Sequence, residues 1–491
     1  MIDLKERKRD WSVASANGGQ NESQEGGQSG RRVFVIAFLC FILAVSSLMA
    51  QTGERLFRTD IEHNIKIDLY KPSDWDSIKV RFHNSVTEDL VYTPVRIDID
   101  HTVFDSVGLS IKGNTYVDFN SPSMFYPFKI DMNEFVKGQK FDNIKKFNLN
   151  NKEYDNNIVM NNIYAAFGLP YCRTSKAAVY ISNTWVGEYL ILEQVDNTYL
   201  KRVFGNDEQN LYKGDNQAYL DWLGGIQKYY ESRYSLKNNE EINDYSDLIH
   251  FIDILNNSNN PALEDSVKSH FDLENYMKIL SLQVLMGKHD DYFDKGHNYY
   301  LYHNGSDDRF SFIPYDNDMV LYPGNNLFMT QSQRFPLFGF IFGSKNLRQQ
   351  YVSCMCSVMN KIESAIPPIE LKYHADFSAY KDYVSSSIFA RTIEIADAGY
   401  HCSSTSIINS AESQLLMYIS RNSLFVESPK QMSVHLEIFS MSGQVVYQQD
   451  WKPAENNTGT INLEFLKAGM YVARLRNDQA VFSLKITISG R

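Results

Sequence analysis

The sequence predicts an α+β protein in which a strand-rich part comes first, a mainly helical part follows, and a small module of strands ends the chain. Short runs of apolar residues at strand spacing fill the region between about residues 57 and 195. Apolar residues at helical spacing dominate from 196 to about 425, and alternating runs return between 430 and 491. With 491 residues, 43% of them apolar, the chain can bury more than one core.

Six runs predict strands in the first part: IKIDLY, VRIDI, VGLSIKG, PFKI, AAVYI and WVGEYLIL. One helix interrupts them between Asp155 and Phe167. Asp155 is a suitable N-cap, apolar residues recur at helical spacing behind it, and Gly168 with Pro170 supplies a stop.

Beyond Val195, three segments predict helices: SDLIHFIDILNN, DLENYMKILSLQVLM and LRQQYVSCMCSVMNKIESAI. Asp272 is the expected N-cap of the second segment. That helix should end at Met286, so Asp290 follows four residues later.

The stretch that follows, from Met286 to Tyr322, has the highest density of residues able to do chemistry. Two strand-like runs, 299–302 and 310–314, flank the turn signal Asn304-Gly305. Acidic, amide and imidazole side chains stand at the ends of these runs: Asp290, His297, Asn298, Asp316 and Asp318. Gathered carboxylates repel one another unless a cation neutralises them, and oxygen ligands suit Mg²⁺ or Mn²⁺ completed by substrate phosphates. On spacing alone, a solvated acidic hairpin is an equal alternative.

The first fifty residues are expected to be a targeting segment. Arg31 and Arg32 precede an apolar run, and small residues lead up to Ala50. We therefore predict a signal peptide at 1–50 and no stable membrane span after its removal. Two alternatives remain: a marginal membrane anchor formed by the same apolar run, and a twin-arginine signal.

Charge and cysteine content set further bounds. The formal net charge of −11 argues against a nucleic-acid partner, for which a clustered basic surface is expected. After the signal peptide four cysteines remain: Cys172, Cys354, Cys356 and Cys402. Their spacing makes no metal site; a bridge from Cys354 or Cys356 to Cys402 and a set of inert buried thiols are both open.

A series of segments resembles the CotH family, which is named for a spore-coat protein and whose members are similar to atypical secreted protein kinases. In order these segments are VYTPVRIDIDHTVFDSVGLSIKGNT, YPFKIDM, KKFNLNN, GLPYCRTSKAAVYISNTWVGEYLILEQVDNTYLKRVFG, NLYKGD, YSLKNNEEINDYSDLIHFIDILNN and the acidic hairpin. The resemblance implies a two-lobed kinase-like domain at 57–425, with a β-rich lobe at about 57–195 and a helical lobe at about 196–425. It also implies transfer of phosphate from ATP to protein hydroxyls with Mg²⁺ or Mn²⁺.

The resemblance also suggests roles for the residues of the acidic hairpin. Asp290 matches the family's Asp in Asn-Trp-Asp-Ser, although Lys-His replaces Asn-Trp here, and it is expected to be the catalytic carboxylate. Asp316 is expected to be the principal metal ligand, Asn298 the amide oxygen ligand of a second metal, and Asp318 a ligand or a support. His297 is expected to fix the loop, and Asp291 to be a solvated bystander.

In the β-rich lobe, three residues are expected to contact the nucleotide. Lys129 would neutralise phosphates, and the alternative is a solvated lysine on a surface strand. Lys112 begins Lys-Gly-Asn, where the family often has Arg-Gly-Asn, and the glycine would let the backbone approach phosphate oxygens, although an ordinary turn glycine is equally plausible. Glu193 would lie at the inter-lobe connection that meets adenine. The helix at 155–167 contains no carboxylate to pair with Lys129, and Glu153 is the nearest alternative.

The last sixty residues predict a small β-sandwich at 430–491. Four period-2 runs carry it: VHLEIF, INLEFL, MYVARLR and VFSLKITI. The module resembles the C-terminal sorting domain of the type IX secretion system of Bacteroidetes, which implies contact with secretion machinery and passage through the periplasm to the outside or the cell surface. The alternative is an ordinary accessory β-domain.

The sequence therefore predicts an exported kinase that phosphorylates Ser/Thr of exported or surface proteins. The alternative is a catalytically weak, surface-displayed binding protein that keeps the same fold.

Overall fold

The structure is a computed structural model and describes the chain from residue 52 onward with gaps. The described residues are 52–84, 91–113, 118, 122–152, 154–257, 262–322, 325–328, 334–400, 402, 416–420, 423–427, 434–440, 444–451, 458–476 and 481–488. The predicted signal peptide and Glu153 lie outside them. The described part is a mixed α/β protein with ten helices and several sheets. None of these helices is long and apolar enough to cross a membrane.

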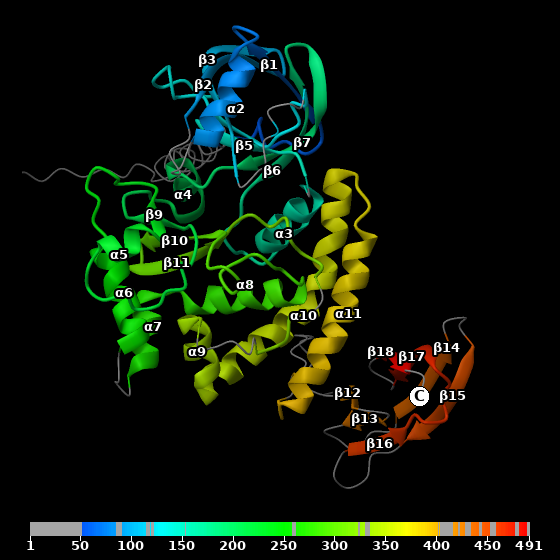
Figure 1. Cartoon of the computed structure of the whole chain (residues 1–491). Helices are drawn as coiled ribbons and strands as arrows, with labels where there is room; N and C mark the ends of the chain where they lie inside the picture. The colour runs from blue at the N-terminus through cyan, green and yellow to red at the C-terminus, as the bar shows by residue number, and fades with distance from the viewer. Residues whose placement is uncertain are drawn as a thin grey trace, which may run out of the picture. The chain divides into compact units, whose positions relative to one another are not determined.

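Seven strands form a closed barrel in the order β1-β2-β3-β4-β5-β7-β6 (Figure 1). Their bounds are β1 Glu62–Leu69, β2 Thr93–Ile99, β3 Thr102–Ile111, β4 Phe128–Asp131, β5 Lys146–Asn150, β6 Thr174–Ile181 and β7 Thr184–Glu193. The barrel closes where β1 runs parallel to β6, with Ile65 opposite Val179. Both residues are fully buried, and alternate residues of the other strands join them in one apolar core.

Two helices, not one, interrupt these strands, so the expectation of a single helix is wrong. α2 spans Asp74–Asn84, and its short polar sequence carries a weak helical pattern. α3 spans Tyr154–Ala166, close to the predicted bounds. Its apolar residues Ile158, Val159 and Ile163 belong to the core of the helical part rather than to the barrel core.

The rest of the larger part combines helices with a four-stranded sheet of order β11-β10-β8-β9. The strands are β8 Leu211–Gly214, β9 Tyr234–Leu236, β10 Tyr299–Asn304 and β11 Arg309–Pro314. The helices are α4 Asn197–Phe204, α5 Lys228–Glu231, α6 Ser246–Asn257, α7 Leu263–His270, α8 Leu273–Leu285, α9 Pro336–Gly343, α10 Lys345–Tyr373 and α11 Ser378–Asp397. α6 has its predicted bounds, and β10 pairs with β11 as the predicted hairpin.

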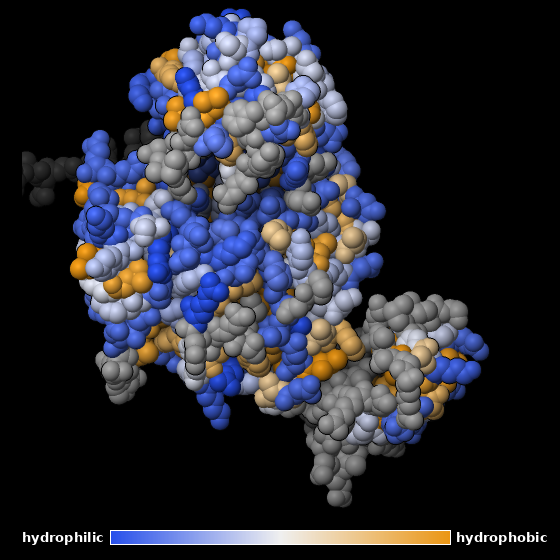
Figure 2. Space-filling view, in the orientation of Figure 1, coloured by the Kyte–Doolittle hydropathy of each residue, from blue (hydrophilic) through white to orange (hydrophobic). Residues whose placement is uncertain are grey.

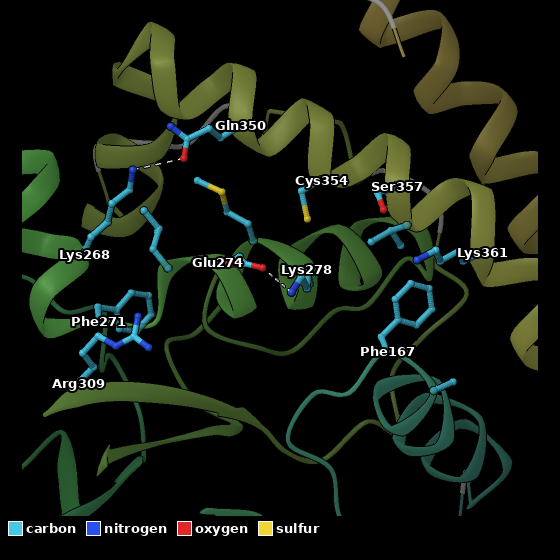
Figure 3. Close-up of a pocket in the computed structure, with 14 residues that line it drawn as sticks. Phe167, Lys268, Phe271, Glu274, Lys278, Arg309, Gln350, Cys354, Ser357 and Lys361 are labelled. Atoms are coloured by element: carbon cyan, nitrogen blue, oxygen red, sulfur yellow. Dashed lines mark hydrogen bonds and ion pairs between the residues drawn. The ribbon is translucent and has the colours of Figure 1, made fainter. Parts of the chain in front are cut away.

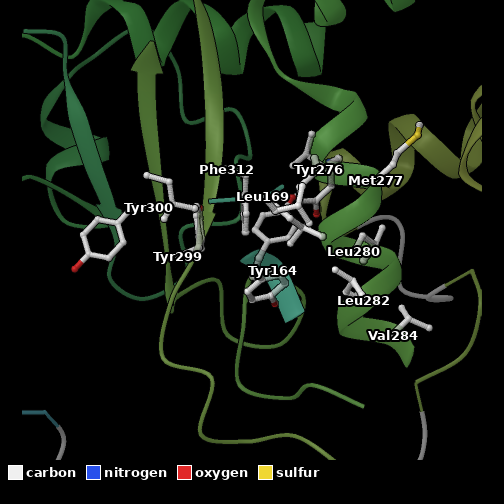
Figure 4. Close-up of a cluster of buried hydrophobic side chains, with 14 of the residues drawn as sticks. Tyr164, Leu169, Tyr276, Met277, Leu280, Leu282, Val284, Tyr299, Tyr300 and Phe312 are labelled. Atoms are coloured by element: carbon white, nitrogen blue, oxygen red, sulfur yellow. The ribbon is translucent and has the colours of Figure 1, made fainter. Parts of the chain in front are cut away.

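Aromatic packing fixes α8 against this hairpin (Figure 4). Tyr299 of β10 stacks on Phe312 of β11 with ring centroids 4.8 Å apart, and Tyr276 of α8 meets Phe312 edge-on at 5.0 Å. Tyr164 of α3 lies in the same cluster and is fully buried. The helix that leads to Asp290 is therefore held on the strands that lead to Asp316.

α10 runs through Pro367 and Pro368 to Tyr373 and is longer than predicted. It packs against α3, α8, α9 and α11. A disulfide joins Cys356 of α10 to Cys402, just beyond α11, which resolves one of the alternatives for the cysteines. Cys172 and Cys354 are free thiols.

The C-terminal residues form two further sheets, of order β12-β13-β16 and β15-β14-β17-β18. Their strands are β12 Leu416–Ser420, β13 Ser423–Glu427, β14 Val434–Ser440, β15 Val445–Trp451, β16 Thr458–Asn462, β17 Gly469–Arg476 and β18 Val481–Ile488. Leu424, Leu436 and Leu475 are fully buried in one cluster that draws on both sheets. The predicted strand INLEFL is wrong in its second half, because β16 ends at Asn462 and a turn follows.

The surface seen in Figure 2 is mainly hydrophilic, and the hydrophobic residues on this face form separate small patches. Single exposed apolar residues of this kind are normal in soluble domains and call for no partner. The exposed apolar residues on this face therefore do not by themselves indicate a binding site.

Candidate functional site

Asp290 lies in a tight loop that begins where α8 ends. Asp272 caps the start of α8 by accepting a hydrogen bond from the Asn275 amide. At the other end Gly287 has a φ of +58°, and a Cβ at this position would collide with the Tyr383 hydroxyl and the Tyr322 carbonyl. Only glycine fits this turn, which sends the chain sharply from the helix to Asp290.

The Asp290 carboxylate is held by two cationic or polar groups. Its Oδ1 lies 2.7 Å from Lys295 Nζ and 2.9 Å from His297 Nε2. Partial burial alone would raise the pKa of Asp290, but the hydrogen bonds and charges of Lys295 and His297 outweigh burial and hold the pKa below its ordinary value. His297 thus fixes the loop, as the sequence predicts.

Asn298 ties this loop to the chain that follows β11. Its Nδ2 donates to the Asp290 carbonyl at 2.7 Å and to Asp290 Oδ2 at 3.3 Å, and its own carbonyl accepts from the Tyr315 amide. No hydrogen bond from a described residue reaches the amide oxygen of Asn298, which leaves this oxygen available as a ligand.

Asp316 and Asp318 follow directly and bring two more carboxylates to the same place. Neither carboxylate forms an ion pair or hydrogen bond with another described side chain. Burial first, and then the charge of Asp316, raise the pKa of Asp318 to about 7; Asp290 acts in the same direction, and Lys288 opposes it. Asp290, Asp316 and Asp318 are therefore near enough to repel one another.

The backbone is left-handed at three of these residues, with φ of 60° at Asp290, 56° at Asn298 and 49° at Asp316. Asp and Asn tolerate this region better than most residues, yet each such residue still costs on the order of 1 kcal/mol. Such conformations cluster at active sites, where the surrounding structure holds side chains in a required direction.

Lysines face these acids from the barrel and the neighbouring sheet. Lys112, at the end of β3, donates to Asn150 Oδ1 at 2.8 Å. Burial lowers its pKa, and the charges of Asp316 and Asp318 oppose that change. Lys112 therefore lies within electrostatic reach of both carboxylates.

Lys129 on β4 lies beside further lysines and has no carboxylate partner among the described residues. Its strand neighbours are Ser110 of β3 and Asn148 of β5. Burial, and then the charges of its lysine neighbours, lower the pKa of Lys129 to about 7; these neighbours are Lys146, Lys112, Lys237 and Lys213. Lys146 and Lys213 are themselves ion-paired with Asp131 and Asp215, at 2.9 and 3.2 Å. The lysines around Lys129 still lower its pKa, which indicates a positive potential that would attract an anion.

Glu193 ends β7, but its side chain is turned into a buried ion triad. Its carboxylate lies 2.6 Å from Arg173 and 2.7 Å from Arg202, and it is 2% exposed. The Glu193 amide donates to the Arg173 carbonyl. The structure thus keeps the Glu193 side chain apart from the acids and lysines described above.

Asp291 is not a solvated bystander, so that expectation is wrong. It is fully buried, lies 2.6 Å from the equally buried Lys288, and accepts a hydrogen bond from Gln283. Lys288 Nζ also donates to the Tyr315 carbonyl. Lys288, one of the two residues that depart from the family's motif, therefore forms an internal ion pair with Asp291 and joins the Asp290 loop to the chain before Asp316.

Sequence reasoning missed two asparagines of α3 that hold the Asp316–Asp318 segment. Asn156 Nδ2 donates to the Asp318 carbonyl at 2.5 Å, and Asn156 Oδ1 accepts from Tyr380 of α11. Asn157 Oδ1 accepts from the Asn317 amide at 3.0 Å. Adjacent asparagines in a helix with a buried apolar face were the available signal, because such residues are poor helix formers.

The donor set fits a hard divalent cation. Asp316, Asp318 and the free amide oxygen of Asn298 are oxygen donors, and the raised pKa of Asp318 reflects charge that a cation would balance. Within the described residues no three His, Cys, Asp or Glu side chains form a complete cation site by themselves. Mg²⁺ commonly needs only one or two carboxylates, because substrate phosphates and water complete its shell.

Comparison with known proteins gives two family matches. The model of the CotH kinase protein family matches residues 109–362, and that of the secretion system C-terminal sorting domain matches residues 420–489. The second match indicates export through the type IX secretion system and handling by its machinery.

One curated relative and two solved structures are also similar. The inner spore coat protein H of Bacillus subtilis (strain 168) is 24% identical over 231 residues, which are 45% of this chain and 59% of that protein. The chain thus spans less than two thirds of this relative. A HipA, HipB and operator DNA complex from Shewanella oneidensis MR-1 is 11% identical, with a TM-score of 0.31, and covers 59% of this chain and 67% of that one. An immunoglobulin-like β-sandwich protein from Bacteroides vulgatus is 17% identical, with a TM-score of 0.14, and covers 15% of this chain and 83% of that one.

Proposed function

Because the chain belongs to the CotH kinase protein family, we propose that it is an exported atypical protein kinase that transfers the γ-phosphate of ATP to serine or threonine hydroxyls. Its substrates are exported or surface proteins, and its metal is Mg²⁺ or Mn²⁺. In this proposal the barrel is the first lobe of a kinase-like domain and the helical part, up to α11, is the second lobe. The C-terminal sheets, from β12 to β18, form a β-sandwich that begins at Leu416 rather than at the predicted 430.

The observation that carries the proposal is the pair of carboxylates, Asp316 and Asp318, within electrostatic reach of Lys112. Two carboxylates without an ion-pair partner among the described residues, together with lysines near them, match the needs of a nucleoside triphosphate bound through a metal. The phosphates interact with Lys112 and Lys129, while Asp316, Asn298 and Asp318 hold the cation. A bound divalent cation supplies neutralisation of the charge that develops on the phosphates.

Asp290 has a different role in the proposed reaction. Its carboxylate, fixed by Lys295 and His297, orients the substrate hydroxyl and takes its proton as the phosphate is transferred. Glu193 contributes through its backbone near adenine, since its side chain is held by Arg173 and Arg202.

A second candidate function is a catalytically weak binding protein displayed at the cell surface. One observation favours it: the charges that act most strongly on Lys129 are all those of other lysines, so the usual coupling of this lysine to a helix carboxylate is missing. The two candidates differ in rate rather than in fold.

The test is transfer of radiolabelled phosphate from ATP by the full chain, with Mg²⁺ or Mn²⁺, compared with two variants. Asp290→Asn should still bind nucleotide but lose transfer by about 10²-fold or more, because the proton acceptor is lost. Asp316→Ala should lose metal-dependent nucleotide binding. Equal transfer by the wild type and Asp290→Asn would disprove the catalytic role, and nucleotide binding without any transfer would favour the second candidate.

A further inference from the structure

A groove follows one side of α10, at the other end of α8 from Asp290. Two adjoining cavities of about 650 and 350 Å³ form it, and they share Ala166, Phe167 and Lys361 (Figure 3). We call it the α10 groove. None of the residues assigned to the nucleotide, the metal or the catalytic step lines it.

The α10 groove is long because one face of a long helix lines it. The residues that α10 contributes recur every three or four positions: Gln350, Cys354, Ser357, Lys361, Ser364 and Pro368, with Lys372 one turn further. This spacing keeps them on one side of the helix. From Gln350 to Lys372 the groove extends about 33 Å at the usual rise of an α-helix.

The lining of the α10 groove mixes apolar side chains with polar and charged ones, and its apolar residues form what we call the floor. The apolar floor of the first cavity includes Met277 of α8, Val358 of α10, and Phe167, just beyond α3. Figure 3 shows Phe167 pointing toward α10. Ile369 continues the apolar floor into the second cavity. Apolar surface that is buried when a ligand binds here contributes about 25 cal/mol of binding free energy per Å².

Positive charge without a matching carboxylate lies along this apolar floor. Lys268, Lys278 and Arg309 also line the first cavity, but each is paired with a carboxylate of Glu264, Glu274 or Asp307. Lys361 is exposed, lines both cavities, and has no ion-pair partner among the described residues. Lys372 is bonded to the neutral amide oxygen of Asn162 at 3.0 Å. The lysines thus give the groove a positive charge, although the chain as a whole has a net charge of −11.

We propose that the α10 groove binds an acidic segment of the protein substrate, whose apolar side chains occupy the floor while its carboxylates pair with Lys361 and Lys372. That the bound protein is the substrate rests on the proposed kinase function; the acidic and apolar character of the segment rests on the groove alone. The length of the groove fits about ten residues in extended form.

The position of α8 fixes the distance between docking and phosphate transfer. Leu273, at the start of α8, lines the groove, and Asp290 follows the other end of the helix. The thirteen residues of α8 span about 20 Å, which an extended chain covers in about six residues. The phosphorylated residue should therefore lie at least about six residues from the docked segment.

The experiment measures binding of a fluorescein-labelled synthetic peptide of about twelve residues, made of Glu and Leu, to the full chain by fluorescence anisotropy. Lys361→Glu should weaken binding by about tenfold, because the change replaces an attraction with a repulsion. The matched control is Lys345→Glu, which makes the same charge change on α10 outside the groove. Its affinity should equal that of the wild type.

Three results would overturn the proposal: no binding of the peptide, equal binding by Lys361→Glu and wild type, or equal binding of a peptide with Gln in place of every Glu. Binding of vesicles of anionic phospholipid through Lys361, without binding of the peptide, would make the groove a membrane contact and would also overturn it. Asp290→Asn should bind the peptide as the wild type does. A chain that binds the peptide in this pattern but transfers no phosphate disproves the kinase function and leaves the acidic-peptide groove in place.

Discussion

Lys129 shows what a partly buried lysine demands of its surroundings. A cation that has lost part of its water is costly, and this one lies beside other lysines. The described residues provide no carboxylate to relieve the cost. A bound anion would offset the cost of the Lys129 charge, and the phosphates of the proposed nucleotide are such an anion.

Lys129 should make the stability of the protein depend on pH. Its folded-state pKa is about 7, below the ordinary 10.5. Between these values the unfolded chain binds the proton and the folded chain does not, so the free energy of unfolding should rise as pH increases from about 7 toward 10. Urea unfolding of the wild type and Lys129→Met across this range measures the effect.

Lys129→Met should lack this part of the rise, since it has no proton to release. The matched control is Lys66→Met, the same change on β1, which should follow the wild type. A wild-type curve parallel to that of Lys129→Met would contradict the assignment.

Asn156 is a positioning residue, because it acts on the metal segment through the Asp318 backbone. Asn156→Asp removes the hydrogen bond to the Asp318 carbonyl but keeps an acceptor for Tyr380. We expect it to raise the Mg²⁺ concentration needed for nucleotide binding about fivefold to tenfold, since one hydrogen bond contributes about 1 kcal/mol. A magnesium titration of nucleotide binding measures this change.

Tyr380→Phe tests the other hydrogen bond of Asn156. It removes the Tyr380 hydroxyl that donates to Asn156 Oδ1 and leaves the Asn156 amide group able to donate to the Asp318 carbonyl. A smaller shift is expected from it than from Asn156→Asp. Unchanged magnesium dependence in Asn156→Asp, with an unchanged melting temperature, would show that the hydrogen bond to Asp318 does not position the segment.

At the scale of elements, α11 acts as a brace for the chain that follows Asp318. The Tyr383 hydroxyl donates to the Tyr322 carbonyl at 2.6 Å, Glu394 accepts from the Leu327 amide at 2.6 Å, and Arg391 donates to the Asn325 carbonyl. The disulfide from Cys356 fastens the chain at the end of α11 to α10.

Removing the disulfide should therefore loosen this brace. Its cysteines are 46 residues apart, and a cross-link of this size contributes about 2–4 kcal/mol to stability. Cys402→Ser should lower the free energy of unfolding by about that amount. Cys354→Ser, which changes a free cysteine on the same helix, should not, and equal melting of the two variants would show that the cross-link is not formed in solution.

Strong local patterns made some elements predictable. The apolar period of α6 and the Asp272 cap of α8 are local signals, and both are confirmed. α2, β5 and α11 carry weak patterns: β5 has only five residues, two of them Asn, and α11 contains three consecutive serines. Their identity depends on distant partners that no local pattern reveals.

The residues of the candidate site also differ in whether the sequence alone could predict them. Asp290, Asn298, Asp316 and Asp318 could be found because one short stretch of chain contains all four. The support from Asn156 could not, since it lies 162 residues from Asp318 in sequence. The burial of Asp291 was equally hidden, because its pairing with Lys288 depends on how tightly the loop turns.

At the scale of the whole molecule, the sorting domain directs export, a role separate from the phosphate transfer proposed for the rest of the chain. Its buried residues form a cluster of their own, distinct from the cores of the barrel and the helical part. A domain with its own core can be removed while the cores of the remaining parts stay intact.

Deleting the residues from Leu416 onward, which removes every strand of the two C-terminal sheets, should therefore misplace the protein without unfolding it. We expect the shortened chain to accumulate in the periplasm, with the melting temperature of the remaining domain unchanged. Cell fractionation and thermal unfolding measure the two outcomes. A truncated chain found at the cell surface, or one that melts markedly lower, would mean that the C-terminal sheets are structural rather than a sorting signal.

The parallel pairing of β1 with β6 has a consequence for the time course of folding. Ile65 meets Val179, so the barrel cannot close until more than a hundred further residues have been made. At about 5–20 residues per second this takes on the order of ten seconds, during which β1 offers an unpaired edge to other chains. The nascent protein thus passes through a period of aggregation risk that ends only when β6 emerges, and a chaperone that binds extended strands would be most useful to it in that interval.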